Sequence, residues 1–199
     1  MSEYTAIYEA CESLTELLRR EMCPEPVPKR ENIGLCEPQN PEDFQLTVWL
    51  YNIEEQRNSG TRGYIPDELD PNVERYSPAR LKLSILISAH SKASAIQRAA
   101  DEYRIIGRAL QTVLDNPSIP NALLTGSLTG QRVPVLLETA KLSTEEMARI
   151  WNNSNKIIKP SFAVTLSQIE IKSNRVKQIA PRVSRAEFDT RQNAQRRNP

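Results

Sequence analysis

The sequence predicts an α+β fold: a small mixed β-sheet of about four main strands packed with about three helices, followed by an extended basic C-terminal tail. Segments with helix and strand periodicity alternate in the order α-β-β-α-β-α-β, and long connections join them. With 199 residues, of which 39% are hydrophobic and 26% charged, the chain is long enough for one buried core. We therefore expect an α+β domain at 1–171 and a basic extension at 172–199.

The first helix is indicated by apolar residues that recur on one helical face: Ile7, Ala10, Cys11, Leu14, Leu17 and Leu18. The prolines of CPEPVP at 23–28 end this helix, because proline removes a backbone donor and restricts the residue before it. The short apolar piece NIGLC at 32–36 is predicted to form a minor strand.

Two strands are predicted on either side of a long loop. FQLTVWLYNI at 44–53 alternates strictly, and aromatic residues on its second face indicate that both faces are covered. RLKLSILISAH at 80–90 repeats the alternation. The residues between them, 54–80, are rich in glycine, proline and charge, so we expect a long loop there.

A long helix is predicted next by an apolar stripe of about five turns, ended by DNP at 115–117. Its members are Ile96, Ala99, Ala100, Tyr103, Ile106, Gly107, Leu110 and Leu114. Glycine costs a helix interior about 1 kcal/mol against alanine. We therefore interpret Gly107 as a point of close packing against the sheet.

The following segment contains a turn and a third strand. TGSLTGQR at 125–132 lacks the ending of a phosphate-binding loop, so we interpret it as a flexible turn. VPVLLETAKL at 133–142 is predicted to be a strand. Because Pro134 cannot donate to a ladder, this strand is expected at a sheet edge or to start in a bulge.

A short, well-capped helix and a fourth strand complete the predicted domain. Ser143 and Glu146 form the pattern of a capping box, with Leu142 and Met147 at the positions of a hydrophobic staple. SFAVTLSQIEI at 161–171 alternates up to Gln168, where the apolar phase shifts by one residue. A β-bulge near Ser167 would accommodate this shift.

No convergent catalytic or metal-binding set is visible. His90 has no nearby carboxylate or second ligand, so we expect a surface or strand-end role for it. Cys11, Cys23 and Cys36 are too far apart for a zinc site and are expected to be reduced, half-buried thiols. PDELDP at 66–71 lacks calcium-loop spacing and is interpreted as a solvated loop. We therefore expect no enzyme activity, no cofactor, no metal and no small-molecule substrate.

The sequence also bears on location. No apolar run approaches the roughly 20 residues of a membrane span, and the N-terminal residues lack the pattern of a signal peptide. We therefore expect the chain to be cytoplasmic on synthesis and to have no membrane partner.

The net charge of +1 conceals an asymmetry, because residues 172–199 carry +6 and the preceding residues carry −5. A basic tail fits docking onto an acidic protein surface. It also fits nucleic-acid binding, although Phe188 is the only aromatic residue among these cations and the acidic body would repel phosphates. A solvated end without a partner is the third possibility.

Several segments together resemble the tail-terminator, or cap, proteins of phage-tail-like contractile injection systems. They are VWLYNIEEQRN at 48–58, RLKLSILISAH at 80–90, EYRIIGRALQTVLDNP at 102–117, and LSTEEMARIWNN followed by KPSFAVTL within 142–166. These pieces follow the family's order over nearly the whole body. The chain departs from the family at 83–90, where an aromatic-containing strand is usual, and at 162–166, where a tyrosine is expected.

The resemblance implies a structural protein that forms a homohexameric ring on the baseplate-distal end of the inner tube and contractile sheath. Its partners would be the tube and sheath proteins, and after synthesis it would become part of the assembled particle, whether that particle is retained or released. Under this interpretation the basic tail, with Arg175, Lys177, Arg182 and Arg185, is predicted to contact the sheath. The alternative is a nucleic-acid-binding adaptor that acts through the same tail.

Overall fold

The computed structural model describes residues 4–56, 62–67, 70, 72–151 and 157–179. The predicted α+β fold class is confirmed, with three α-helices and a mixed β-sheet in the described part of the chain. The domain division at 172 stays a prediction. The structure also contains a second, smaller sheet that the sequence pattern did not indicate.

The main sheet has five strands in the order β1-β2-β5-β7-β6. Their bounds are Ile33–Leu35, Leu46–Gln56, Ala79–Ala89, Ser161–Ile171 and Leu136–Ala140, respectively. β1 pairs in parallel with β2 and the other pairs are antiparallel, so the sheet is mixed, as predicted. β6, the strand that follows Pro134, lies at the edge of this sheet.

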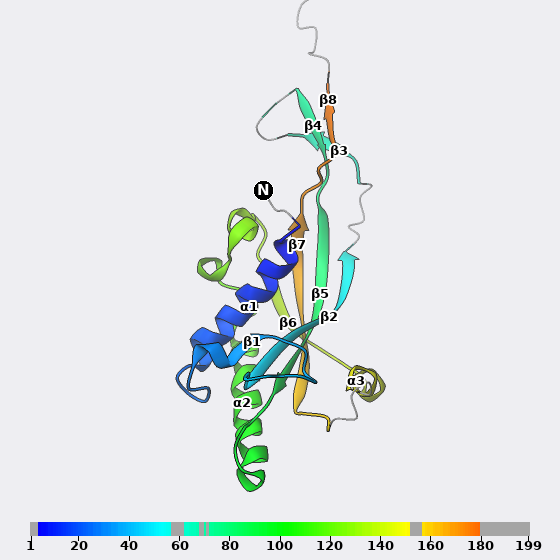
Figure 1. Cartoon of the computed structure of the whole chain (residues 1–199). Helices are drawn as coiled ribbons and strands as arrows, with labels where there is room; N and C mark the ends of the chain where they lie inside the picture. Colours follow the sequence, from blue (N-terminus) through cyan, green and yellow to red (C-terminus); the bar gives the residue numbers. More distant parts are fainter. Residues whose placement is uncertain (1–3, 57–61, 68–69, 71, 152–156, 180–199) are drawn as a thin grey trace, which may run out of the picture.

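The core lies between the main sheet and two helices, α1 (Ala6–Met22) and α2 (Ala95–Asp115), which lie on one side of it (Figure 1). Leu18 of α1, Ile85 of β5 and Leu166 of β7 are fully buried in it. A third helix, α3 (Thr144–Trp151), lies on the opposite side, where its Trp151 is also buried. Both faces of the sheet are therefore covered in part.

The predicted bulge in the last long strand is confirmed. Gln168 has φ +65°, and the β5–β7 register shifts opposite it, between Leu81 and Leu83. The local side chains satisfy the displaced backbone, because Gln56 accepts from the Gln168 N–H and Gln131 donates to its carbonyl at 2.6 Å. The extra residue restores Ile169 to the core face.

The predicted flexible turn at 125–132 was wrong. Residues Gly126–Gly130 form a 3-10 helix, η3, preceded by another at Asn121–Leu123, η2. The Glu9 carboxylate of α1 accepts from the Ser127 N–H at 2.8 Å and from the Ser127 hydroxyl. Burial opposes ionisation of Glu9, but these hydrogen bonds outweigh it and lower its pKa. Glu9 thus holds this segment against the first helix.

The predicted long loop at 54–80 was also wrong. β2 continues to Gln56, and β3 (Tyr64–Pro66) and β4 (Val73–Tyr76) follow before β5 begins at Ala79. β8 (Val176–Gln178) joins them in a three-stranded antiparallel sheet, β3-β4-β8, that we call the arm. The arm extends beyond one end of the main sheet (Figure 1). The charged residues and prolines of this segment are typical of a loop, so these short strands were not predicted.

Most of the apolar stripe predicted to pack α2 on the sheet faces solvent instead, and only Ile106 of its members is half-buried against the core. Ile96, Tyr103 and Leu114 are 94%, 63% and 64% exposed, respectively. The buried residues of α2 are Glu102, Ile105, Ala109, Thr112 and Val113. The close contact expected at Gly107 is wrong too, since no atom lies within 4 Å of a Cβ built there. Periodicity identified an apolar face, but it could not tell which partner covers that face.

The capping box of α3 is confirmed. The Ser143 N–H donates to Glu146 Oε2 at 2.9 Å, and the Glu146 N–H donates back to Ser143 Oγ at 3.2 Å. These hydrogen bonds lower the pKa of Glu146. Leu142 and Met147 are both half-buried, and their contact as a hydrophobic staple stays a prediction.

Two glycine substitutions should have opposite effects on stability. Gly107→Ala should raise the free energy of unfolding by about 1 kcal/mol, because the new methyl group meets open space and alanine favours the helix. Gly126→Ala should lower it, because φ is +57° there and the Cβ would meet the Glu9 carboxylate. Urea unfolding of both variants tests this pair, and a destabilised Gly107→Ala would contradict the open environment described for α2.

Candidate partner-binding surface

The arm is held together by the C-terminal strand, which the sequence analysis placed in the tail. The Tyr76 N–H donates to the Arg175 carbonyl at 3.0 Å, and the Ile179 N–H donates to the Asn72 carbonyl at 2.8 Å. Arg75 of β4 bonds Asp67 at 2.8 Å and reaches the Ser173 carbonyl. The first part of the tail is therefore a structural part of the arm.

Two tyrosines and three cations form a cluster on the arm. The rings of Tyr64 and Tyr76 meet edge to face, with centroids 5.4 Å apart. Arg62 and Arg175 lie 5.7 and 5.6 Å from the Tyr76 ring, and Lys177 lies 6.0 Å from the Tyr64 ring. Such cation–π contacts contribute about 0.5–1 kcal/mol each at exposed sites. The cluster therefore holds β8 on β4 while its charged groups stay near the surface.

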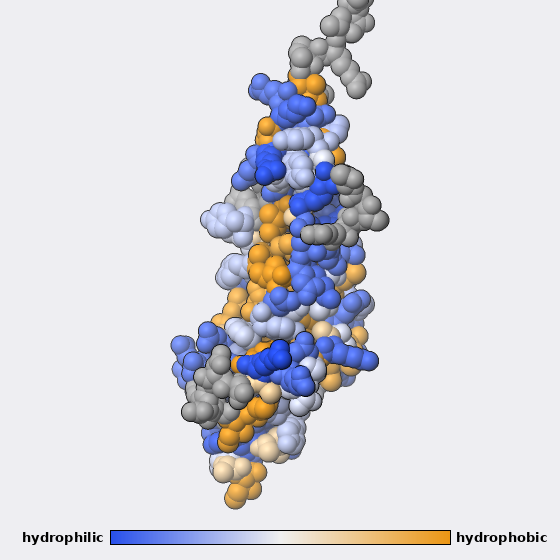
Figure 2. All heavy atoms as spheres, turned by 90° about the vertical axis from the view of Figure 1, so that its right-hand side faces the viewer, coloured by the Kyte–Doolittle hydropathy of each residue, from blue (hydrophilic) through white to orange (hydrophobic). Residues whose placement is uncertain are grey.

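The arm presents both apolar surface and open strand edges. Tyr64, Ile65 and Val176 are 44%, 48% and 49% exposed. Figure 2 shows apolar and strongly hydrophilic side chains next to one another over this end of the molecule. In the part of the chain that the structure describes, β3 and β8 each pair on one side only. An outer strand of this kind can accept a strand from another chain.

The structure thus brings two of the four predicted contact residues together, since Arg175 and Lys177 both lie in the cluster. Arg182 and Arg185 lie outside the described residues. Sequence reasoning missed Arg62, Tyr64 and Tyr76, because they come from the segment that was interpreted as a loop. The alternation of large residues in YIP and VERY was the available signal for β3 and β4, but each run is only three or four residues long.

His90 follows the end of β5, so the predicted strand-end position is confirmed. The alternative prediction, a surface position, is wrong. Its side chain is buried, and Nε2 lies 3.2 Å from the Thr47 hydroxyl. Burial, with a smaller contribution from the charge of Lys159, lowers the pKa of His90 to about 4. Lys159 in turn pairs with the buried carboxylate of Glu102 at 2.6 Å. His90 is therefore neutral near pH 7 and links the ends of β2 and β5.

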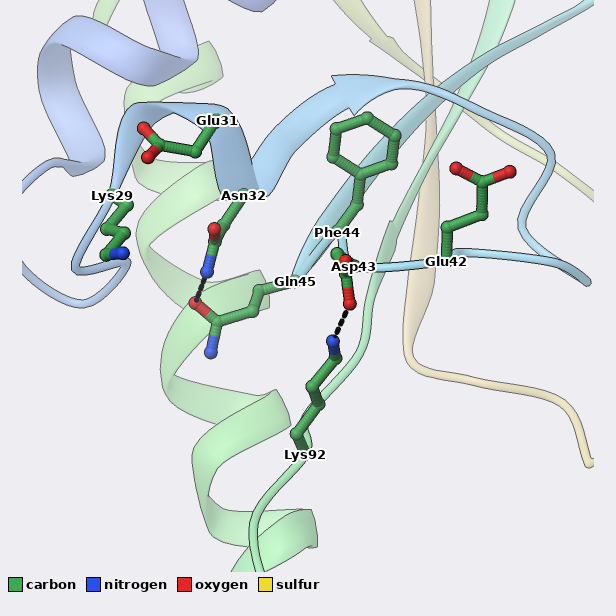
Figure 3. A pocket seen from close by; sticks show the side chains of 8 residues that line it. All are labelled: Lys29, Glu31, Asn32, Glu42, Asp43, Phe44, Gln45 and Lys92. Carbon is green, nitrogen blue, oxygen red and sulfur yellow. Dashed lines mark hydrogen bonds and ion pairs between the residues drawn. The ribbon is translucent and has the colours of Figure 1, made fainter.

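An open polar hollow of about 420 Å³ lies where the connections before β1 and β2 approach the start of α2 (Figure 3). Asn32 donates to Gln45 at 3.2 Å across it, and Lys92 pairs with Asp43. The hydrogen bond and charge of Lys92 lower the pKa of Asp43. Within the described residues, no three His, Cys, Asp or Glu side chains come together as metal ligands.

The half-buried position predicted for the cysteines is confirmed for Cys23 and Cys36 and is wrong for Cys11. All three are free thiols; Cys11 is buried and the other two are half-buried. Burial raises the pKa of Cys11 to about 12, so this thiol stays protonated. Among the described residues, no helix is long and apolar enough to cross a membrane.

The chain belongs to the family described as Pvc16 N-terminal domain, which matches residues 9–185. The family resemblance inferred from the sequence is thereby confirmed. Comparison with curated proteins gives no match.

The solved structures that share the fold include two whose descriptions name a terminator or a cap. One is the sheath/tube terminator of an extracellular contractile injection system, PVC, in its extended state, with a TM-score of 0.58 and 14% identity over 98% of this chain and 67% of that one. The other is the tube-terminating cap of the anti-feeding prophage, with a TM-score of 0.54 and 17% identity over 88% of this chain and 58% of that one. The chain thus spans about two thirds or less of the length of these proteins.

The tyrosine cluster can be tested by removing one ring. Tyr76→Ala should free β8 from β4, because the ring contacts Tyr64, Arg62 and Arg175. Losing about 1–2 kcal/mol of local stability should speed hydrogen exchange of the Ile179 amide roughly tenfold. The Ile85 amide in the centre of the sheet should be unaffected. Tyr8→Ala, at another exposed tyrosine, is the matched control, and unchanged exchange at Ile179 would contradict the role of the cluster.

The buried histidine predicts a pH dependence of stability. Since the pKa of folded His90, about 4, lies below its ordinary value of 6.5, the unfolded chain binds the proton first as pH falls. The stabilisation of the fold that depends on neutral His90, up to about 3 kcal/mol, is therefore fully present above pH 6.5 and is lost as pH falls towards 4. Free energies of unfolding of the wild type and of His90→Gln, measured between pH 4 and pH 6.5, test this pH dependence. Parallel pH profiles would show that His90 does not titrate as described.

Proposed function

We propose that this protein is a structural terminator of a contractile injection system. Six copies form a ring on the end of the inner tube and sheath that lies furthest from the baseplate. The ring stops polymerisation and anchors the sheath, and the protein performs no reaction. After its synthesis in the cytoplasm, the protein becomes part of the assembled particle.

The match to the Pvc16 N-terminal domain family over residues 9–185 carries this proposal. The likeness of fold to one protein described as a sheath/tube terminator and another described as a tube-terminating cap supports it. The physical logic is that a tube grows because each ring presents the heterologous surface that the next ring needs. A subunit that matches this surface on one side and offers no equivalent on the other ends growth.

The arm is the part of the molecule that we assign to the sheath. It extends beyond the main sheet and presents exposed apolar side chains, such as Ile65 and Val176, beside the cations Arg175 and Lys177. Among the described residues, its outer strands β3 and β8 each have one unpaired edge on which a sheath strand can dock. Arg182 and Arg185 follow β8 in the sequence and extend the same positive charge.

The terminator role predicts the length of particles. Co-expressing the tube and sheath proteins of the same particle with this protein should give tubes of defined length with ring density at one end in electron micrographs. Omitting it should give longer tubes of variable length without that density. Equal length distributions in both preparations would contradict a role in termination.

Charge reversal tests the arm separately from the ring. Arg175→Glu together with Lys177→Glu should leave rings on tube ends but reduce the fraction of sheathed particles roughly tenfold, because two of the cluster's cations become anions. Lys29→Glu with Lys141→Glu reverses two exposed charges elsewhere and is the matched control. If the arm variant sheathes particles normally, the sheath contact lies on another surface.

Nucleic-acid binding remains the second candidate, and one observation favours it more than the sequence did. Tyr64 and Tyr76 lie beside the cations of the arm, and exposed aromatic rings beside cations can stack on bases. This function predicts binding of single-stranded DNA that weakens steeply with salt and is lost in Tyr64→Ala. If the protein does not bind single-stranded DNA at low salt, nucleic-acid binding is excluded as its function.

A further inference from the structure

Helix α2 has two different faces, and the apolar one is uncovered. Its buried side carries the polar residues Glu102 and Thr112 along with Ile105, Ala109 and Val113. The outward side carries Ile96, Ala100, Tyr103, Gly107, Leu110 and Leu114, all of which are exposed. A surface helix normally keeps its apolar residues on the face towards the core, whereas α2 carries apolar residues on both sides. The outward side therefore needs another partner.

The spacing of the outward residues identifies the kind of partner. They follow one another at intervals of four, three, four, three and four residues, which is the seam of a coiled coil. This seam lies directly opposite the residues that α2 buries against the body, so a second helix can approach without meeting the sheet. At Gly107 the space outside the helix is open. A large side chain from a partner helix fits at that point.

We propose that the partner is α2 of a second copy of this chain, packed antiparallel around a two-fold axis. In this arrangement one register places Tyr103 of each copy opposite Gly107 of the other. The same register places Ala100 opposite Leu110, and Ile96 opposite Leu114. The layers Tyr103–Gly107 and Ala100–Leu110 each pair a large residue with a small one, so side chains fill the space between the two helices evenly. The chain thus supplies a complementary surface for itself.

The surroundings of α2 fit this arrangement. Residues 94–100 are exposed on all sides, and the start of α2 projects past the end of the main sheet (Figure 1). Figure 2 shows apolar side chains at this lower tip, where Ile96 is 94% exposed. The two Arg104 residues meet near the axis and oppose the association.

A two-fold contact uses the same surface on both copies, so it closes as a dimer and does not continue. It differs from the heterologous contact that a six-fold ring requires. The inference therefore goes beyond the proposed terminator role and concerns the chain before it joins a particle. In that state pairing would cover the apolar stripe that is exposed on the single chain.

The mass of the free protein tests the pairing. Light scattering and sedimentation at increasing concentration, up to about 100 µM, should show a species of twice 22.6 kDa. Salt should tighten the dimer, because it screens the facing Arg104 residues, and Arg104→Gln should tighten it several-fold at low salt. A monomer throughout this range, or a closed hexamer, would overturn the pairing.

A volume exchange tests the register. Gly107→Leu and Tyr103→Ala should each raise the dimer dissociation constant at least tenfold, because one crowds the central layer and the other empties it. Combining both changes in one chain should restore affinity to within about threefold of wild type, since leucine then faces alanine. Circular dichroism confirms folding, which Gly107→Leu should keep because its side chain enters open space.

Tyr8→Ala, at an exposed tyrosine of α1, should not change the dimer. The antiparallel register would be overturned if neither single substitution changed the dimer dissociation constant. It would also be overturned if the double variant did not regain the affinity that the single variants lose. Neither result depends on tube or sheath proteins. The length of particles therefore tests the terminator role independently, and either proposal can fail while the other stands.

Discussion

The pairing of β5 with both of its neighbours is the interaction on which the rest of the structure depends. β5 pairs with β2 on one side and with β7 on the other, each over nearly its full eleven residues. Its core-facing residues Leu83, Ile85 and Ile87 are fully buried under the helices. β4 ends at Tyr76, so the same chain segment enters the arm directly. The position of the arm therefore follows from the position of β5.

The sequence was most informative where one strong pattern had one possible partner. Strict alternation predicted β2 and β5, and the shift of phase at Gln168 predicted the bulge, because successive side chains of a strand point to opposite faces of the sheet. Ser143 and Glu146 predicted the start of α3, because a capping box depends on four consecutive residues alone. The small strands of the arm were missed, since β3 and β8 each span three residues and their stability depends on contacts distant in sequence.

The error in α2 has a different physical origin. The pattern from Ile96 to Leu114 was a true apolar stripe, but burial within one chain was assumed for it. The sheet is covered instead by a face that includes Glu102, whose carboxylate is compensated by Lys159. A buried ion pair of this kind is invisible to periodicity because its partners are 57 residues apart. Likewise, burial of His90 beside Thr47 could not be predicted from neighbouring residues alone. For the candidate surface, the composition of the tail predicted the cations Arg175 and Lys177, but not Tyr64 and Tyr76, whose rings they contact.

The connection between the arm and the body has a mechanical consequence. β8 follows β7 after a short link, and β4 leads into β5, so these two connections between the arm and the body continue directly into long strands of the main sheet. In an antiparallel ladder the hydrogen bonds lie perpendicular to the strands. A pull on the arm along the sheet would therefore act on β5 and β7 in the same direction, because both join the arm at the same end. It would load the hydrogen bonds that join β7 to its outer neighbour β6 together, in shear, rather than unzip them one after another. The body is built to transmit tension from one end to the other without first losing its core.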